Sequence, residues 1–326
     1  MKRLVTAAFA FFAALAAAAP TQAQDYPSRT VTIVVPFPAG GPTDELARLV
    51  ANALSSKLHG SFIVQNVSGG GANIGSERVA HAAADGYTLL LHNLAISANV
   101  TLYKDQHLGF DTERDLRPVM FLNRNPLVMV GRKSLEPNNL AELVAWMKTH
   151  QAKTAIPGYG TTGHLATVLF GQEAKITQDL IPYRGGAPLM TDLLGDHVDL
   201  FFGTPQQLVP QVAAGKLKVY GLSTAEKSAQ LPNADSFPKM FGPKLEIHYW
   251  QALFAPSKTP DAVVAKLNAT LQEIVEDPAI LKIWAGEGVS AFPKQDRSEE
   301  AGRAMLKSEI ARWAQVIRDN NIRIEQ

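Results

Sequence analysis

One short stretch, residues 31–44, restricts the fold of this 326-residue chain more than any other. Residues 31–35 are nearly all apolar and β-branched, which is typical of a parallel strand that is covered on both faces. Prolines and glycines end the run, and Pro42 stands where a helix prefers its first residue. Apolar residues then recur with the spacing of one buried helix face, at Leu46, Leu49, Val50, Ala53 and Leu54. A buried strand that leads directly into an amphipathic helix predicts an α/β fold.

The turn between this strand and this helix is a candidate ligand-binding loop. The amides of Ala39, Gly40 and Gly41 precede a helix N-terminus at the carboxyl end of a strand, where an open α/β sheet binds ligands and where an anion is favoured. A side chain at Gly41 is expected to push the ligand outward or to strain the turn. Asp44 is expected to organise the turn, because a bare carboxylate would repel an anionic ligand. A plain strand-to-helix turn accounts for the same residues.

The N-terminus has the pattern of a secretory signal peptide. Lys2 and Arg3 precede an uncharged run at residues 4–19, and small residues stand at Thr21 and Ala23. The apolar run is too short to span a membrane comfortably. Cleavage after Ala23 is predicted to leave 303 residues as an exported, soluble protein.

Composition excludes several classes of function. Removing Lys2 and Arg3 leaves 29 basic against 30 acidic residues, and this balance argues against a nucleic-acid partner. The chain has no cysteine, which excludes thiol nucleophiles, iron–sulfur clusters and cysteine zinc sites. Its eight histidines are scattered without metal-binding spacing, so neither a metal nor another cofactor is expected.

Strands alternate with helices after the first unit, which indicates parallel α/β sheets. Extended residues at 117–130 predict a crossing between two domains, and an extended segment at 217–223 predicts the return. Three helical segments are expected to close the chain, at residues 261–275, 278–287 and 298–320. The expected division is a signal peptide at 1–23, a discontinuous first domain at 24–123 and 226–326, and a second domain at 124–225.

Residues 158–163 read G-x-G-x-x-G, the fingerprint of a dinucleotide-binding loop. Three observations argue against a dinucleotide-binding loop here. The strand before the motif is very short, no acid stands at the end of the next strand, and the protein is expected to be exported. In the favoured interpretation the loop is a second anion-binding turn, in which backbone amides and the hydroxyls of Thr161 and Thr162 face the ligand. A plain capped turn is the alternative, and no nicotinamide or flavin is expected to bind.

His164 follows this motif in the first turn of a helix. Because a helix N-terminus disfavours imidazolium, a neutral donor or acceptor is favoured over a general base, and a buried structural histidine fits equally. No G-x-S-x-G motif and no local Ser–His–Asp signature indicate a hydrolase.

Short motifs along the whole mature chain carry a resemblance to one family. They lie at residues 26–29, 34–41 with Asp44, 73–75, 85–89, 163–165, 182–188, 192–195, 198–200, 214–217 and 253–256. In this order they resemble the periplasmic solute-binding proteins of tripartite tricarboxylate transporters, also called Bug-type receptors.

The resemblance implies a two-domain α/β periplasmic binding protein of the type II, Venus-flytrap class, with a ligand cleft between the domains. It implies a monomer that captures a small carboxylate, such as a dicarboxylate, tricarboxylate, amino acid or aromatic acid, and delivers it to a membrane permease without catalysis. Two alternatives stay open: a periplasmic enzyme that uses His164 or His92 on a carboxylate, and a ligand sensor that docks on a signalling partner.

The resemblance also assigns the ligand-binding residues. In the first domain they are Phe37, Pro38, Ala39, Gly40, Gly41 and Asp44, together with His92 and Asn93 after the third strand. In the second domain they are Gly160, Thr161, Thr162, His164, Gly203 and Thr204. The residues at 92–94 and 202–204 depart from those common in relatives, so the ligand's identity stays open.

Overall fold

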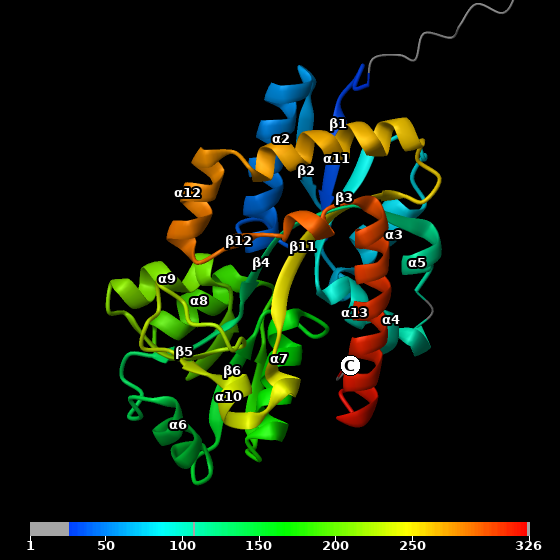
Figure 1. The fold of residues 1–326 in the computed structure, drawn as a ribbon. Coiled ribbons are helices and arrows are strands. Elements are labelled where there is room, and N and C mark those ends of the chain that lie inside the picture. The colour runs from blue at the N-terminus through cyan, green and yellow to red at the C-terminus, as the bar shows by residue number, and fades with distance from the viewer. Residues whose placement is uncertain (1–25, 107, 325–326) are drawn as a thin grey trace, which may run out of the picture.

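The computed structural model describes residues 26–106 and 108–324, and the predicted signal peptide lies outside this part of the chain. The described chain forms two lobes, each built on a six-stranded mixed sheet with helices packed against it (Figure 1). The α/β architecture predicted from the sequence is confirmed. No helix within the described residues is long and apolar enough to cross a membrane.

The first sheet has the strand order β12-β4-β11-β3-β1-β2. Its strands are β1 (Val31–Val35), β2 (Phe62–Asn66), β3 (Thr88–Asn93), β4 (Leu116–Pro126), β11 (His248–Pro256) and β12 (Ser290–Ala291). β1 pairs in parallel with β2 and β3, whereas β11 runs antiparallel between β3 and β4. β1 lies between β3 and the edge strand β2, and the complete burial of Val31, Ile33, Val34 and Val35 explains its apolar sequence.

The second sheet has the order β10-β9-β5-β8-β6-β7. Its strands are β5 (Val128–Arg132), β6 (Ala152–Ile156), β7 (Gln178–Pro182), β8 (Leu200–Gly203), β9 (Leu217–Leu222) and β10 (Asp235–Ser236). β6 is parallel to β7 and β8, and β5 runs antiparallel between β8 and β9. Each sheet has one inner strand that runs antiparallel to both of its neighbours: β11 in the first sheet and β5 in the second. Each of these is the first strand that the chain forms after it crosses from the other lobe.

Helices pack against both sheets. Those of the first lobe are α2 (Pro42–Leu58), α3 (Asn73–Ala80), α4 (Ala95–Leu102), α5 (Thr112–Asp115), α11 (Asp261–Val275), α12 (Pro278–Glu287) and α13 (Glu299–Asp319). Those of the second lobe are α6 (Leu140–Met147), α7 (Thr162–Glu173), α8 (Gly186–Leu194), α9 (Pro205–Ala213) and α10 (Phe237–Phe241). Short 3-10 turns lie at Gly70–Ala72, Lys104–Gln106, Pro243–Leu245 and Lys294–Asp296.

The chain changes sheets at Leu127, within the predicted first crossing, but it returns later than expected. β9 and β10 both belong to the second sheet, and the chain rejoins the first sheet only after Ile247. The segment at 217–223 is therefore extended as predicted but is not the crossing, and the boundary at 225 places β10 in the wrong lobe. A two-residue strand such as β10 has no periodic pattern that the sequence could reveal.

Ser223 joins the two connections between the lobes. Its amide donates to the Leu127 carbonyl oxygen over 2.9 Å, and the Leu127 amide donates to Ser223 Oγ over 2.8 Å. Ser223 Oγ donates to the Ile247 carbonyl oxygen over 2.6 Å, and the Ile247 amide donates to the Ser223 carbonyl oxygen over 2.7 Å. This buried serine, 1% exposed, thus holds both connections side by side.

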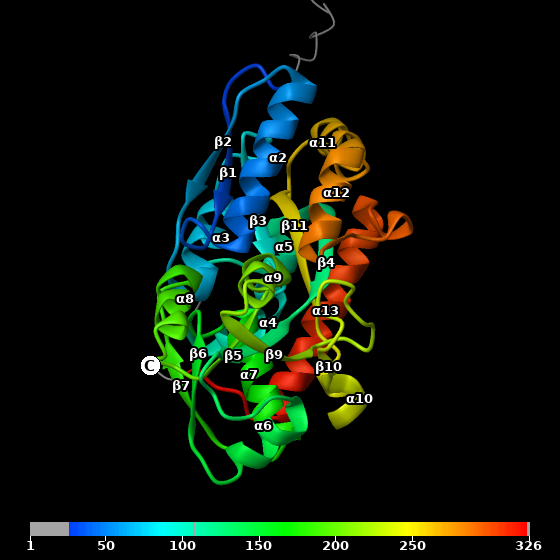
Figure 2. The same cartoon turned by 90° about the vertical axis from the view of Figure 1, so that its left-hand side faces the viewer.

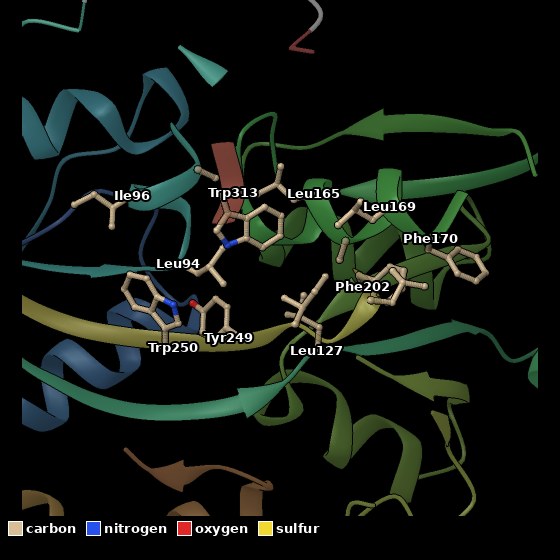
Figure 3. Packing of buried hydrophobic residues seen from close by; sticks show 14 of the residues in the cluster. Leu94, Ile96, Leu127, Leu165, Leu169, Phe170, Phe202, Tyr249, Trp250 and Trp313 are labelled. Atoms are coloured by element: carbon tan, nitrogen blue, oxygen red, sulfur yellow. The ribbon is translucent and has the colours of Figure 1, made fainter. Parts of the chain in front are cut away.

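One hydrophobic cluster contains residues of both lobes (Figure 3). Leu94 and Trp250 enter it from the first sheet, Leu165 and Phe202 from the second lobe, and Trp313 from α13. α13 packs along α4 and reaches the second lobe (Figure 2). There the Gln172 side-chain amide donates to the Asn320 carbonyl oxygen over 2.6 Å. The lobes therefore share one hydrophobic core.

Candidate ligand-binding site

A cavity of about 110 Å³ lies between the lobes. Its walls are the loops at the carboxyl ends of β1 and β3 in the first lobe, and of β6, β7 and β8 in the second. Leu127 at the first crossing and Tyr249 at the start of β11 close it further. This is the edge at which open α/β sheets bind ligands.

Four helix N-termini line this cavity, those of α2, α7, α8 and α9. The shortest of them, α8 and α9, have nine residues each, so each helix is long enough to carry a useful dipole. Unpaired amides and the positive end of the dipole both attract negative charge at such a terminus. Convergence of four termini on one small space favours an anionic ligand.

The side chains around the cavity agree with this electrostatic preference. Among the described residues that line it, Arg184 is the only charged one, and neither aspartate nor glutamate is present. Thr162 and Thr204 line the cavity, and their buried hydroxyls have no hydrogen-bond partner among the described residues. Buried hydroxyls without partners are uncommon in folded proteins, and these two can donate to the oxygens of a ligand.

The first loop, residues 36–41, has few free amides because three of the residues from 36 to 42 are prolines. The Gly40 amide donates to Asp44 Oδ2 over 2.9 Å and is therefore not directed at a ligand. The amides of Ala39 and Gly41 have no partner among the described residues. The loop thus offers the backbone of Ala39 and Gly41, rather than that of Gly40, to the cavity.

Asp44 organises this loop, as its position in the sequence predicts. Its carboxylate accepts from Arg48 Nε over 2.9 Å and from Asn66 Nδ2 over 2.9 Å, in addition to the Gly40 amide. Burial alone would raise the pKa of Asp44, but the hydrogen bonds from Arg48, Gly40 and Asn66 outweigh it and hold the pKa below its usual value. Asp44 does not line the cavity, and Arg48 compensates its charge.

His164 plays the same part in the second lobe. The Gly160 amide donates to His164 Nδ1 over 3.3 Å, so this ring nitrogen is an acceptor. Burial lowers the pKa of His164 to about 4, which makes the imidazole neutral at neutral pH. The Thr161 hydroxyl caps the same helix by accepting from the His164 amide over 3.4 Å. This low pKa agrees with the expectation of a neutral histidine, although the cause is burial, and the ring does not line the cavity.

His92 and Asn93 have different surroundings although they are neighbours. His92 is buried against the Phe37 ring, with centroids 5.2 Å apart, and burial lowers its pKa to about 3. Asn93 faces the cavity, and its Nδ2 donates to Thr43 Oγ1 over 3.2 Å. Thr43 Oγ1 also lies 3.2 Å from the Tyr249 hydroxyl, which completes a polar floor.

The cavity brings together most of the residues expected from the sequence. Those that line it are Phe37, Pro38, Ala39, Gly41, Asn93, Thr161, Thr162, Gly203 and Thr204. Those that do not are Gly40, Asp44, His92, Gly160 and His164, which support its walls. Lining residues outside the predicted set include Thr43, Arg184, Gln207 and Tyr249. Arg184 lies inside one of the family motifs, at residues 182–188, and this motif was the signal from which it could have been predicted as a lining residue.

Residues 46–322 match the sequence profile described as tripartite tricarboxylate transporter family receptor. The chain belongs to this family. BugT of Bordetella pertussis is 31% identical to it over 330 aligned residues, which cover 100% of this chain and 99% of BugT. A protein of Agrobacterium vitis, encoded in the TAR-I ttuE-ttuC' intergenic region, is 35% identical and covers 91% of this chain, with 86% of its own length matched. The resemblance to Bug-type receptors is confirmed.

Solved structures of similar proteins have the same fold. The periplasmic binding protein BugD superposes with a TM-score of 0.86 at 31% identity, over 92% of this chain and 100% of BugD. MatC of Rhodopseudomonas palustris with bound malate gives 0.84 at 29% identity, over 90% of this chain and 100% of MatC. An R. palustris protein with adipate also gives 0.84, at 31% identity, over 91% and 99% of the two chains. The two-domain binding-protein fold of this receptor is therefore confirmed.

Proposed function

We propose that this protein is an exported, monomeric periplasmic receptor that binds a small carboxylate between its lobes and delivers it to the membrane subunits of a tripartite tricarboxylate-type permease. The observation that carries the proposal is the convergence of four helix N-termini on a cavity whose described lining contains no carboxylate. The malate and the adipate of the solved relatives support the same ligand class.

In this proposal the amides of Ala39 and Gly41 hold one carboxylate from the first lobe, and the hydroxyls of Thr162 and Thr204 hold it from the second. The lobes also touch outside the cavity. The Tyr103 hydroxyl donates to the Tyr159 carbonyl oxygen over 3.3 Å, and Gln230 Nε2 donates to the Ala285 carbonyl oxygen over 2.5 Å. This closed arrangement is the one that the permease is proposed to recognise.

Catalysis is not part of the proposal. His92 and His164, which an enzyme acting on a carboxylate would use, are buried outside the cavity wall, and burial lowers the pKa of both. Burial raises the pKa of Tyr249, which does line the cavity, to about 12, so its hydroxyl stays protonated. The family and the solved relatives are solute-binding proteins, which agrees with binding without turnover.

A thermal-shift screen with di-, tri- and aromatic carboxylates tests the proposed ligand class. The protein is recovered from the periplasm, and its intact mass shows whether the exported chain starts at Gln24. A ligand at about 100 times its dissociation constant is expected to stabilise the wild type by roughly 2.7 kcal/mol, or several degrees. Gly41→Val is expected to fold normally and to lose most of this shift, because its side chain enters the cavity wall.

Of the two effects expected from a side chain at Gly41, the structure favours displacement of the ligand over strain of the turn. The Gly41 backbone has φ −95°, and an added Cβ would meet no atom closer than 3.8 Å, so the turn is not strained by a side chain there. Gly286→Val, in open space on α12, is the matched control and is expected to keep the full shift. A ligand that shifts Gly41→Val as much as the wild type removes this loop from the site, and a wild type that no carboxylate stabilises refutes the proposed ligand class.

A further inference from the structure

Outside the ligand cavity, the lobes also meet where helix α4 of the first lobe contacts residues 158–161 of the second. Asn99 lies in α4, and Tyr103 follows its last residue. Because the two are four residues apart, their side chains lie on the same face of the helix. Asn99 is 1% exposed and Tyr103 is 7% exposed, and neither residue lines the ligand cavity. We call these two side chains the α4 latch.

The Tyr103 side chain lies between a glycine of each lobe. A Cβ on Gly71, in the first lobe, would lie 2.6 Å from Tyr103 Cζ. A Cβ on Gly160, in the second lobe, would lie 2.8 Å from Tyr103 Cε2. Neither distance leaves room for a side chain, so glycine at both positions allows this close approach. The Tyr103 hydroxyl also donates to the Tyr159 carbonyl oxygen over 3.3 Å. Tyr103 therefore joins the lobes by packing and by a hydrogen bond.

Asn99 supports the first-lobe side of this contact. Its Nδ2 donates to the Gly71 carbonyl oxygen over 2.6 Å, which fixes the glycine against which Tyr103 packs. Its Oδ1 faces the second lobe, since a Cβ on Gly160 would lie 2.9 Å from it. Asn99 thus reaches the same two glycines as Tyr103, and the two side chains act on one contact.

The second-lobe loop that meets the α4 latch also faces the ligand cavity. Gly158 and Gly160 flank Tyr159 and have left-handed backbone, with φ of +125° and +76°. The next residue, Thr161, lines the ligand cavity, and its hydroxyl donates to the Gly158 carbonyl oxygen over 2.7 Å. One short loop therefore carries both a wall of the ligand cavity and the contact with Tyr103. Ligand binding and the α4 contact need this loop in the same place.

We propose that the α4 latch stabilises the closed receptor and so sets its affinity without touching the ligand. The inference rests on the proposed function for the class of ligand and goes beyond it, because it assigns affinity to a contact outside the site. A receptor that is mostly open when free binds in proportion to its closed fraction, so the latch tightens every ligand by the same factor. Loss of a group that contacts the ligand would instead affect different ligands unequally.

Titration calorimetry on the wild type, Tyr103→Phe and Tyr87→Phe tests the latch, with succinate, adipate, citrate and benzoate as ligands. Tyr103→Phe keeps the ring and removes the hydrogen bond between the lobes, so every ligand that binds is expected to weaken by about fivefold. Tyr87→Phe is the matched control, because the Tyr87 hydroxyl accepts from the Ser28 amide over 3.0 Å within the first lobe. This control is expected to keep the wild-type affinities.

Distances between spin labels in the ligand-free protein provide a second measurement. The chain has no cysteine, so Lys282→Cys and Lys216→Cys place one label on each lobe, and both positions are exposed. Tyr103→Phe is expected to lower the fraction of closed molecules, whereas Tyr87→Phe is expected to leave it unchanged.

The two measurements separate the latch from the proposed function. Wild-type affinities in Tyr103→Phe, or a loss that differs clearly between ligands, would refute the latch and leave the proposed function standing. If the wild type binds no carboxylate, the proposed function fails and the label distances alone decide. An equal closed fraction in the wild type and Tyr103→Phe would then refute the latch as well.

Discussion

The two loops that face each other across the cleft are built on the same plan. In each, a glycine with left-handed backbone is followed by an extended residue that begins the helix: Gly40 (φ +79°) before Gly41, and Gly160 (φ +76°) before Thr161. In each, the glycine amide donates to the side chain four residues later, which is Asp44 in the first lobe and His164 in the second.

The acceptor differs, and the difference shows how such a loop can be fixed without placing a charge in the site. Asp44 is ionised, but Arg48 and Asn66 hold its carboxylate on the side away from the cavity. His164 is neutral because burial lowers its pKa to about 4. Asp44, an acid paired with Arg48, and His164, a neutral base, thus each accept a glycine amide and fix the loop. Neither places a negative charge in the cavity, so the cavity still favours an anion.

Removal of the Asp44 side chain is expected to be the most damaging change. Asp44→Ala leaves the Gly40 amide and Asn66 Nδ2 short of an acceptor, and we expect a loss of about 3 kcal/mol in the free energy of unfolding. This expected loss is at the low end of the range for breaking a buried ion pair, because the Arg48 side chain is half exposed. Urea unfolding at pH 7 measures it.

Asp44→Asn is the matched control, since its side-chain oxygen can still accept from the Gly40 amide. A loss of about 1 kcal/mol is expected for it. Equal losses for Asp44→Ala and Asp44→Asn would mean that the charge of Asp44, and not its acceptor oxygen, fixes the loop. Asp44 and His164 would then not fix their loops in the same way.

The second prediction uses pH to separate the two loops. The pKa of His164 is about 4 in the folded protein and near 6.5 when unfolded, so the unfolded chain takes up the proton first as pH falls. Its contribution to stability is complete above pH 6.5 and decreases toward pH 4. Between pH 7 and pH 5 the loss from this residue is expected to be about 2 kcal/mol.

His164→Asn, which keeps an acceptor for the Gly160 amide but does not titrate, is expected to lose about 2 kcal/mol less than the wild type over this interval. Asp44→Asn is expected to lose as much as the wild type, because the lowered pKa of Asp44 places its titration below this range. Unfolding curves at both pH values test this, and identical pH dependence in wild type and His164→Asn would contradict it.

The third prediction concerns the two glycines and has the smallest effect on stability. Gly40→Ala and Gly160→Ala each place a side chain on left-handed backbone, and about 1 kcal/mol of destabilisation is expected from this alone. Nothing lies within 4 Å of a Cβ on Gly40, whereas one on Gly160 would lie 2.8 Å from Tyr103 and 2.9 Å from Asn99, both in the other lobe. Gly160→Ala is therefore expected to weaken ligand binding by about tenfold, and Gly40→Ala by no more than about twofold.

Calorimetric titration of both variants with the best carboxylate provides the comparison. Equal affinities would show that the lobes close without bringing Gly160 against Tyr103.

Local chemistry made much of the fold predictable. A β-branched run fixed β1 at residues 31–35, Pro42 marked the start of α2, and the segments at 261–275 and 278–287 coincide with α11 and α12. No helix was predicted at α4 or α9. α4 follows β3 after the single residue Leu94, and α9 contains Pro210, which is unusual inside a helix.

The site was predictable as a set of loops but not residue by residue. Helical side chains point back toward the N-terminus, so the residue four positions after the glycine folds over the loop, and this explains why Asp44 and His164 support the wall instead of lining it. Tyr249 reaches the cavity only through the pairing of β11 with strands more than 100 residues away in sequence, which no local pattern encodes. The sequence also did not show which of Gly40 and Gly41 takes the left-handed backbone.

Ser223 has a consequence for how the cleft can open. Its hydroxyl accepts from one connection between the lobes and donates to the other, so bending one connection alone would leave a buried backbone group unpaired. Opening of the cleft is therefore expected to bend both connections together.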